Sequence, residues 1–122
     1  MRFSLAPILY HVYDTFMTQS KLARLESSIA RIKKQIYELG DLRPGSLTQQ
    51  KRKSKAAYGA YWQLSYTHDG KGHTEYIRSE AITQVKAEVK NYQRYRKLTD
   101  QLIKLSIEKS KLKMALSRSE ST

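Results

Sequence analysis

The sequence predicts a mainly α-helical α+β fold: N-terminal helices, one two-stranded antiparallel β-hairpin, and a long C-terminal helical arm. Three observations predict it. An apolar seam with 3-4 spacing runs over residues 22–39, an alternating segment lies on either side of Asp69-Gly70, and no Gly or Pro occurs from Ser79 onward. At 122 residues, the chain has the length of a single domain, spanning residues 1–122.

The N-terminal helical arm is expected over residues 7–39. Apolar residues in 7–17 recur at i, i+4 and i+8, which predicts a short amphipathic helix with Pro7 in its first turn. A second helix follows, with Ser20 as its N-cap and Gly40 just past its end. Its heptad seam consists of Leu22, Leu25, Ile29, Ile32, Ile36 and Leu39. Fewer than three heptads are unstable alone in water, so this seam needs a neighbour.

A basic loop over residues 40–60 and a β-hairpin over residues 61–78 come next. Trp62, Leu64 and Tyr66 alternate with polar residues, and Asp69-Gly70 provides the turn before the second strand. An isolated hairpin is marginally stable, so we expect Trp62 and Tyr66 to pack in the core. Tyr61 is left open between core packing and stacking on unpaired bases.

The C-terminal arm is expected over residues 79–117, as one long helix or two helices, with Ser79 as N-cap and a frayed tail at 118–122. Its first seam runs through Ile82, Val85, Val89 and Tyr92. The second seam consists of Leu98, Leu102, Leu105, Leu112 and Leu116. The two seams do not share one register, which predicts a bend, local overwinding or a break near Tyr95–Asp100.

The simplest closure packs the 22–39 seam antiparallel on the 98–116 seam, giving an antiparallel helical hairpin or coiled coil. The competing arrangement uses the seams for a homodimer or for a heteromeric protein partner.

The charge balance indicates the class of partner. Lys and Arg number 23 against 11 acidic residues, a formal net charge of +12, and such a field attracts polyanions. The chain has no cysteine, which excludes disulfides, thiolate zinc sites and a cysteine nucleophile. It contains no apolar run of the ~18 residues that a membrane span needs, and the N-terminus lacks the pattern of a signal peptide. We therefore expect no membrane partner and a cytoplasmic location.

Catalytic and metal chemistry find little support in the sequence. The segment HDGKGH places His68, Asp69 and His73 together, but a turn of this composition is what a hairpin needs, and a metal site needs further ligands. The carboxylates are scattered, without a pair suited to acid–base catalysis. No enzyme activity, metal or cofactor is predicted.

Two groups of residues are candidates for binding nucleic acid. The first lies in the basic loop and consists of Gln49, Gln50, Lys51, Arg52, Lys53 and Lys55. The second lies on the long helix and consists of Lys86, Lys90, Arg94, Arg96 and Lys97. Of these, Lys86, Lys90, Arg94 and Lys97 recur at 4-4-3 spacing, away from the apolar seam, and form what we term the cation stripe. The alternative interpretation is a solvated loop and an ordinary exposed helix face.

The segments LRPGSL (42–47) and GAYWQLSY (59–66), followed by the helical segment up to residue 106, resemble a family of small bacterial and archaeal proteins. That family has no settled activity and is often encoded beside transposases. The resemblance covers roughly residues 40–110 and implies a mobile-element context, with DNA favoured over RNA. Family members carry a compact set of cysteines between the two motifs, as in a zinc knuckle. Here the interval is TQQKRKSKAAY, without cysteine, so the resemblance implies no metal role for this chain.

Together these observations predict a small, basic, non-enzymatic DNA-binding protein that acts as an accessory or regulator of a mobile genetic element. The alternative is a coiled-coil protein-interaction subunit of a larger assembly, such as a ribonucleoprotein.

Overall fold

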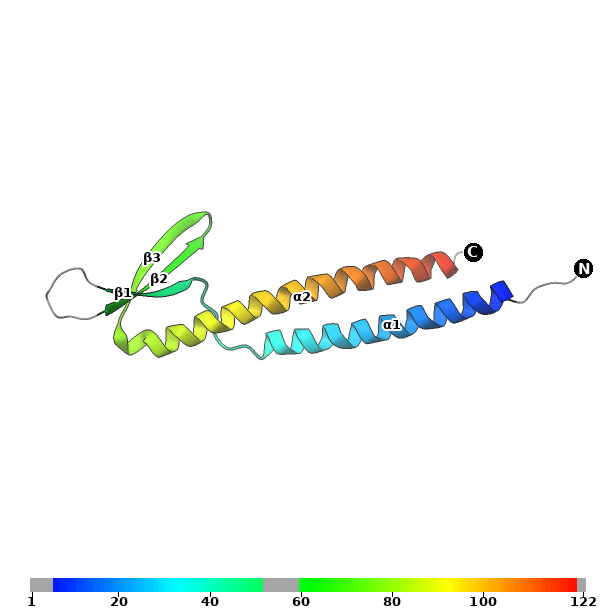
Figure 1. The fold of residues 1–122 in the computed structure, drawn as a ribbon, viewed down its shortest axis with the longest axis horizontal. Coiled ribbons are helices and arrows are strands. Elements are labelled where there is room, and N and C mark those ends of the chain that lie inside the picture. Colours follow the sequence, from blue (N-terminus) through cyan, green and yellow to red (C-terminus); the bar gives the residue numbers. More distant parts are fainter. Residues whose placement is uncertain (1–5, 52–59, 121–122) are drawn as a thin grey trace, which may run out of the picture. The chain divides into compact units, whose positions relative to one another are not determined.

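The computed structural model describes residues 6–51 and 60–120, and it has the predicted α+β class. Helix α1 spans Ala6–Tyr37 and is followed by the strands β1 (Ser46–Lys51), β2 (Ala60–His68) and β3 (Lys71–Ile77). A 3-10 turn at Ser79–Ala81 leads into helix α2, Ile82–Glu120 (Figure 1). No helix in these two ranges is long and apolar enough to cross a membrane.

The chain forms two compact units. We term Glu38–Lys97 the sheet unit, because it holds the three strands and the first half of α2. The helical unit pairs α1 with the part of α2 that begins at Leu98.

The helical unit has the predicted antiparallel closure (Figure 1). Leu25, Ile29 and Ile32 of α1 are buried, as is Leu98 of α2. The other residues of the 22–39 and 98–116 seams within the two helices are half-buried, as expected for an apolar seam shared by only two helices: Leu22, Ile36, Leu102, Leu105, Leu112 and Leu116. Leu39 was predicted as the last seam position, but α1 ends at Tyr37, and Leu39 lies in the segment that leads to β1.

One position of the α2 seam is occupied by a lysine. Lys109 lies four residues after Leu105 and three before Leu112, where the heptad spacing would place an apolar residue. Its Nζ lies 3.7 Å from Oε1 of Glu26 on α1. A single polar seam residue typically fixes the register of a coiled coil at some cost in stability, and this ion pair aligns Glu26 with Lys109.

The prediction of two N-terminal helices was wrong, because α1 is one continuous helix of 32 residues. Ser20 lies inside it and caps nothing. The stretch between the two predicted segments contains neither Gly nor Pro, and the Thr18 hydroxyl donates to the Asp14 carbonyl at 2.9 Å, within the helix. Polar residues alone therefore do not interrupt the helix here.

The sheet contains one strand more than the predicted hairpin. Its order is β1-β2-β3, antiparallel throughout, and β1 pairs with β2 from Ser46↔Ser65 to Lys51↔Ala60. Residues 46–51 belong to the predicted basic loop over residues 40–60, and Leu47 is the only apolar residue of β1. Its pairing with β2 rather than its own hydrophobicity makes this segment a strand.

One face of the sheet packs on the first half of α2. Leu64 is 0% exposed at the centre of this core, surrounded by Ile77, Val85 and Val89. Trp62 and Tyr66 pack against the same cluster, so their predicted core position is confirmed.

The opposite face of the sheet, which we term the open face, carries no helix from the sheet unit. Strand alternation and the pairing register place on it Ser46, Thr48, Gln50, Tyr61, Gln63, Ser65, Thr67, Thr74 and Tyr76.

Helix α2 is uninterrupted over 39 residues, so of the alternatives of one helix or two, the structure has one. Its start differs from the prediction: Ser79 opens a 3-10 turn without acting as a side-chain cap, and the α-helix begins at Ile82. Its end differs too, because the helix reaches Glu120 instead of fraying from residue 118. The boundary between the two units, Lys97/Leu98, falls within the segment where the two seams change register.

Candidate nucleic-acid interface

The cation stripe occupies an exposed side of α2 in the sheet unit. Val85 and Val89 turn towards the sheet and are buried, whereas all four stripe residues, Lys86, Lys90, Arg94 and Lys97, are exposed. Within the described residues, Lys90, Arg94 and Lys97 have no carboxylate at ion-pair distance. This part of the stripe therefore presents positive charge that no side chain of the described chain neutralises.

The one acidic residue near the stripe is directed elsewhere. The Glu88 carboxylate accepts a hydrogen bond from the Gln84 amide at 3.3 Å, and its backbone carbonyl accepts one from the Arg43 N–H at 3.1 Å. Two residues from Lys86 and Lys90 along a helix, Glu88 lies on a different side of α2. The stripe thus keeps a single sign.

Lys86, the first member of the stripe, is fixed by an aromatic ring. Its Nζ lies 4.4 Å from the centroid of the Trp62 ring on β2, a cation–π contact. Sequence spacing could not reveal this contact, because it joins residues in two elements.

Arg96 does not belong with the stripe. It lines a shallow cavity of about 440 Å³ together with Tyr92 and Gln93, on the side of α2 that meets the start of β1 and the end of β2. The remaining lining residues are Pro44, Gly45, Ser46, Ser65, Tyr66 and Thr67. The predicted helix group is thus divided over two sides of α2.

The candidates from the basic loop are divided as well. Gln49 pairs with Trp62 and lies on the helix-facing side of β1, whereas Gln50 pairs with Tyr61 on the open face. The Gln50 amide donates to the Thr48 hydroxyl at 3.2 Å. Lys51 ends β1, and Arg52, Lys53 and Lys55 lie outside the described residues.

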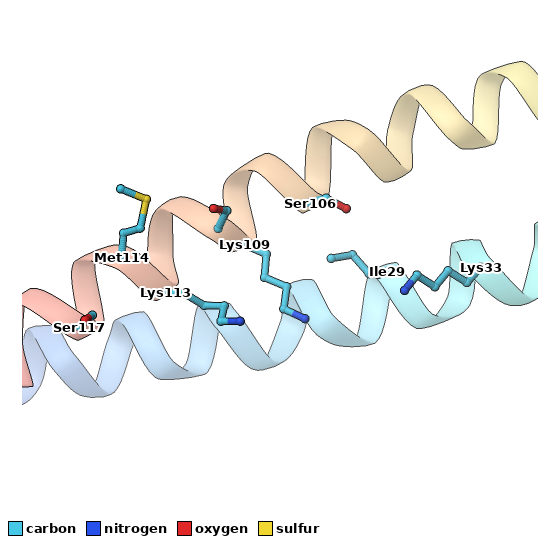
Figure 2. A pocket seen from close by; sticks show the side chains of 8 residues that line it. Ile29, Lys33, Ser106, Lys109, Lys113, Met114 and Ser117 are labelled. Atoms are coloured by element: carbon cyan, nitrogen blue, oxygen red, sulfur yellow. The ribbon is translucent and has the colours of Figure 1, made fainter.

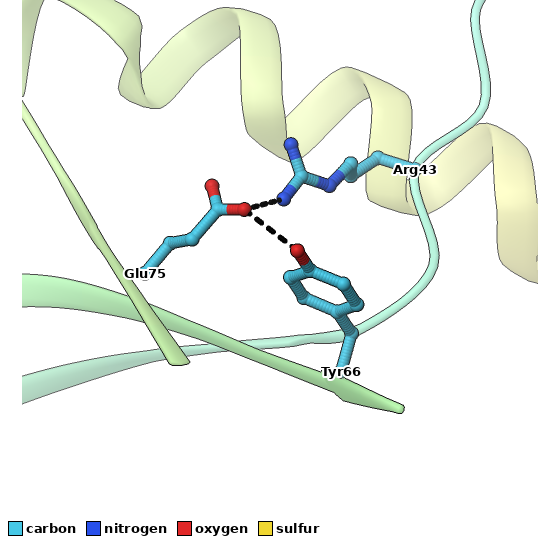
Figure 3. A network of polar contacts seen from close by, with 3 residues as sticks. All are labelled: Arg43, Tyr66 and Glu75. Atoms are coloured by element: carbon cyan, nitrogen blue, oxygen red, sulfur yellow. Dashed lines mark hydrogen bonds and ion pairs between the residues drawn. The ribbon is translucent and has the colours of Figure 1, made fainter. Parts of the chain in front are cut away.

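A polar network joins the LRPG segment to the sheet (Figure 3). Arg43 Nη2 lies 2.6 Å from Oε1 of Glu75, and the Tyr66 hydroxyl donates to the same oxygen at 2.8 Å. The Arg43 guanidinium also lies 4.9 Å from the centroid of the Tyr66 ring, which stacks on His73 on its strand partner β3.

These contacts shift the titration of both acids. The hydrogen bonds from Tyr66 and Arg43 hold the pKa of Glu75 below its ordinary value of 4.5. The hydrogen bond to Glu75 raises the pKa of Tyr66 above its ordinary value of 10.0. Both shifts move the groups away from neutral pH, which is the opposite of what a general acid or base needs. The network is a structural tie, which sequence reasoning missed because its three residues are far apart in the chain.

The histidines of the HDGKGH segment do not converge on a common site. His68 Nε2 lies 3.3 Å from Asp69 in the turn, while His73 stacks on Tyr66. Over residues 6–51 and 60–120, no three acidic or histidine side chains gather as a metal site would require.

A cavity of about 530 Å³ in the helical unit lies between the two helices near the seam lysine (Figure 2). Lys109 and Lys113 reach from α2 towards α1 there, beside Ile29 and Lys33. The other lining residues are Ser106, Ser110, Met114 and Ser117, so this cavity has neither a carboxylate nor a histidine in its lining. A groove formed by small serines and exposed lysine stems provides no activated nucleophile.

Comparison with known families gives one match. The sequence model of a family described as a domain of unknown function (DUF6788) matches residues 22–87. The matched segment includes the second half of α1, the three strands and the first residues of α2. Neither the curated proteins nor the solved structures include a match.

Proposed function

Because this chain belongs to the DUF6788 family, whose description names no function, we propose from its own surface that it is a small, non-enzymatic DNA-binding protein. The observation that carries the proposal is the cation stripe, whose Lys90, Arg94 and Lys97 are exposed without a carboxylate partner in the described chain. Clustered cations of one sign bind phosphates by displacing counterions.

The charge of the whole chain supports the same proposal less specifically. Twelve of the 23 Lys and Arg residues and six of the 11 acidic residues lie in the sheet unit, so the two units carry equal net charge. Net charge therefore attracts a polyanion to the protein without selecting a surface. The arrangement of the stripe is what favours the sheet unit.

The biological context of the proposal comes from the sequence motifs. LRPGSL and GAYWQLSY support an accessory or regulatory role in a mobile genetic element, acting in the cytoplasm on DNA rather than on RNA. The protein would bind DNA without a cofactor.

A charge-matched comparison tests the stripe. One variant combines Lys90→Gln, Arg94→Gln and Lys97→Gln; the control combines Lys104→Gln, Lys111→Gln and Lys113→Gln, three exposed cations of the helical unit. Duplex affinity is measured by fluorescence anisotropy between 50 and 200 mM salt. The slope of log K against log salt should flatten by about 2.7 in the stripe variant, at about 0.9 per phosphate contact, and by less in the control.

Two results would contradict the proposal. Equal flattening in both variants would mean that net charge alone matters and that the stripe is not a contact surface. No binding of duplex by the unmodified protein at 50 mM salt would remove DNA binding altogether.

A second candidate function, a protein-interaction subunit, is favoured by one observation. Ile103, Ile107 and Met114 are 58%, 51% and 56% exposed on α2, and helical periodicity places them opposite the seam that meets α1. If this face docks a protein, Ile107→Gln should abolish co-sedimentation with that partner and leave duplex affinity unchanged. If the unmodified protein stays monodisperse and co-sediments with no other protein, this function is wrong.

A further inference from the structure

We infer that the open face of the sheet enters the major groove of duplex DNA and contacts the edges of its bases. The inference rests on the proposed function and deepens it, because it names the surface that distinguishes one sequence from another. The cation stripe contacts phosphates, which carry no sequence information by themselves.

The chemistry of the open face suits base edges. Apart from Ser46, Ser65 and Thr67, which line the cavity shared with α2, its residues are hydroxyls, amides and two tyrosines, and none of them is charged: Thr48, Gln50, Tyr61, Gln63, Thr74 and Tyr76. A glutamine amide can pair with both N6 and N7 of adenine, and serine or threonine hydroxyls can donate to or accept from either base pair. In the described part of the sheet unit, α2 packs on the other face, and the exposed Thr48, Gln50, Thr74 and Tyr76 are available to a ligand.

The carboxylates of the sheet are kept away from this face. Glu75 points to the opposite side, where Arg43 and Tyr66 hold it. Asp69 lies in the β2–β3 turn beside His68. A nucleic acid that approaches the open face therefore meets no negative side chain in the described strands.

A cation stands at one end of the face. Arg78 follows β3 with extended backbone, φ −67° and ψ 149°, so strand alternation places it on the same side as Tyr76. It is exposed, and within the described residues it has no carboxylate at ion-pair distance. An arginine beside a neutral hydrogen-bonding face can bind the phosphates that border a groove.

The dimensions of the groove limit how much of the sheet can enter it. Adjacent strands lie roughly 4.8 Å apart. The major groove of B-form DNA is about 12 Å wide and admits a two-stranded β-ribbon, so the central strand β2 enters together with one neighbour, β3. The strands have six, nine and seven residues, long enough to follow several base pairs.

The two tyrosines favour duplex over single-stranded nucleic acid. Stacking platforms offer separate ring faces to successive unpaired bases. Here the rings of Tyr61 and Tyr76 pack on each other, with centroids 5.9 Å apart and planes tilted by 40°. They form one cross-strand pair beside a larger set of hydrogen-bonding groups.

The test begins with selection of a preferred sequence from random duplexes by the full chain. Affinity for the selected and the scrambled duplex is then measured for Gln63→Ala and Tyr76→Thr, the latter chosen because threonine retains strand propensity. Gln101→Ala and Tyr37→Thr are matched controls, since both residues are exposed in the helical unit, Tyr37 by 89% and Tyr76 by 59%. Circular dichroism confirms that each variant is folded.

We expect the preference for the selected duplex to fall by roughly tenfold to a hundredfold in Gln63→Ala and Tyr76→Thr, at an unchanged salt slope. The controls should keep the preference. Full preference in both sheet variants, or failure of any sequence to emerge from the selection, overturns the inference but leaves salt-dependent DNA binding in place. If Gln63→Ala and Tyr76→Thr weaken binding to single-stranded oligonucleotides and leave binding to duplex DNA unchanged, the groove assignment is wrong. No binding to any duplex at low salt removes the proposed function itself.

Discussion

Gly45 lies where the backbone preceding β1 approaches β2 closely. Its φ is +136°, a backbone conformation that residues other than glycine rarely adopt. A Cβ at this position would lie 2.9 Å from the Ser65 carbonyl oxygen and 2.9 Å from Cδ1 of Leu64. The leucine methyl can rotate away, but the carbonyl is part of β2 and cannot move without disturbing the first residue pair of β1, Ser46↔Ser65.

Gly45→Ala should therefore carry two costs. Backbone strain at such a φ is worth about 1–3 kcal/mol. Overpacking against a fixed neighbour adds about 1–3 kcal/mol. The sum, about 2–6 kcal/mol, is a large share of the 5–15 kcal/mol that typically stabilises a domain.

Two other glycines separate these costs. Gly70 has φ +75° but no atom within 4 Å of a built Cβ, so Gly70→Ala should lose only the strain, about 1–2 kcal/mol. Gly72 has neither feature, and Gly72→Ala should be neutral or stabilising by about 0.5–1 kcal/mol, because alanine restricts the unfolded chain.

The assay is urea unfolding followed by the fluorescence of Trp62, the only tryptophan of the chain. It lies in the same unit as all three glycines. With a slope of about 1–3 kcal/mol per M urea, a loss of 3 kcal/mol lowers the midpoint by about 1–3 M. A midpoint for Gly45→Ala equal to or above that of Gly70→Ala would refute the close approach of the backbone at Gly45.

Three further predictions follow from the core, the polar network and the helical seam. Leu64→Ala should cost about 2–5 kcal/mol in the same urea assay, because the side chain is fully buried, whereas the exposed Ile107→Ala should change the free energy of unfolding by under about 0.5 kcal/mol. Since the folded-state pKa of Glu75 is lowered, its contribution to stability is present above pH 4.5 and is lost as the pH falls through the lowered pKa. The folded-state pKa of Tyr66 is raised, so its contribution is present below pH 10.0 and is lost as the pH rises through the raised pKa. Tyr66→Phe should move the acid unfolding midpoint, measured by Trp62 fluorescence, to higher pH, and an unchanged midpoint would contradict the network. Lys109→Leu completes the apolar seam and should raise the thermal midpoint of helix loss in circular dichroism at 222 nm. Because the Lys109 side chain is 32% exposed, the gain should stay below the value of about 1.5–3 kcal/mol that full burial of a leucine is worth. A lower midpoint would show that the ion pair with Glu26 outweighs packing.

The apolar patterns of the sequence predicted much of the fold, because burial leaves a periodic trace. The 3-4 spacing of Leu25, Ile29 and Ile32 identified the helical seam, and the alternation of Trp62, Leu64 and Tyr66 identified both β2 and its buried face. In each case the side chains that carry the pattern are the ones that leave water on folding.

The strand β1 left no such trace. Of SLTQQK, only Leu47 meets the core; the segment is a strand because β2 offers it unpaired backbone groups. The predictions of N-caps at Ser20 and Ser79 were wrong for a related reason. A serine is compatible with an N-cap, but whether a helix begins there depends on the residues around it.

The candidate interface was predictable only in part. Helical spacing identified the cation stripe. Arg96 is also a cation of the same helix, but it lies on another side of α2. Gln49 and Gln50 are adjacent in sequence and opposed in the sheet. The open face is visible only once the three strands are paired, since Gln63 and Tyr76 come together through register and not through sequence proximity.

The order of the two units along the chain has a consequence for synthesis on the ribosome. The sheet unit, Glu38–Lys97, is continuous, so all its hydrogen-bonding partners emerge together. Helix α1 emerges first, but the half of α2 that covers Leu25, Ile29 and Ile32 is translated only after those 60 residues. At a translation rate of about 5–20 residues per second, roughly 3–12 s pass before the residues that pack on the α1 seam are synthesised. During that interval the nascent chain exposes an apolar helix face. Nascent chains on adjacent ribosomes of the same mRNA can pack on this face in place of residues 98–116.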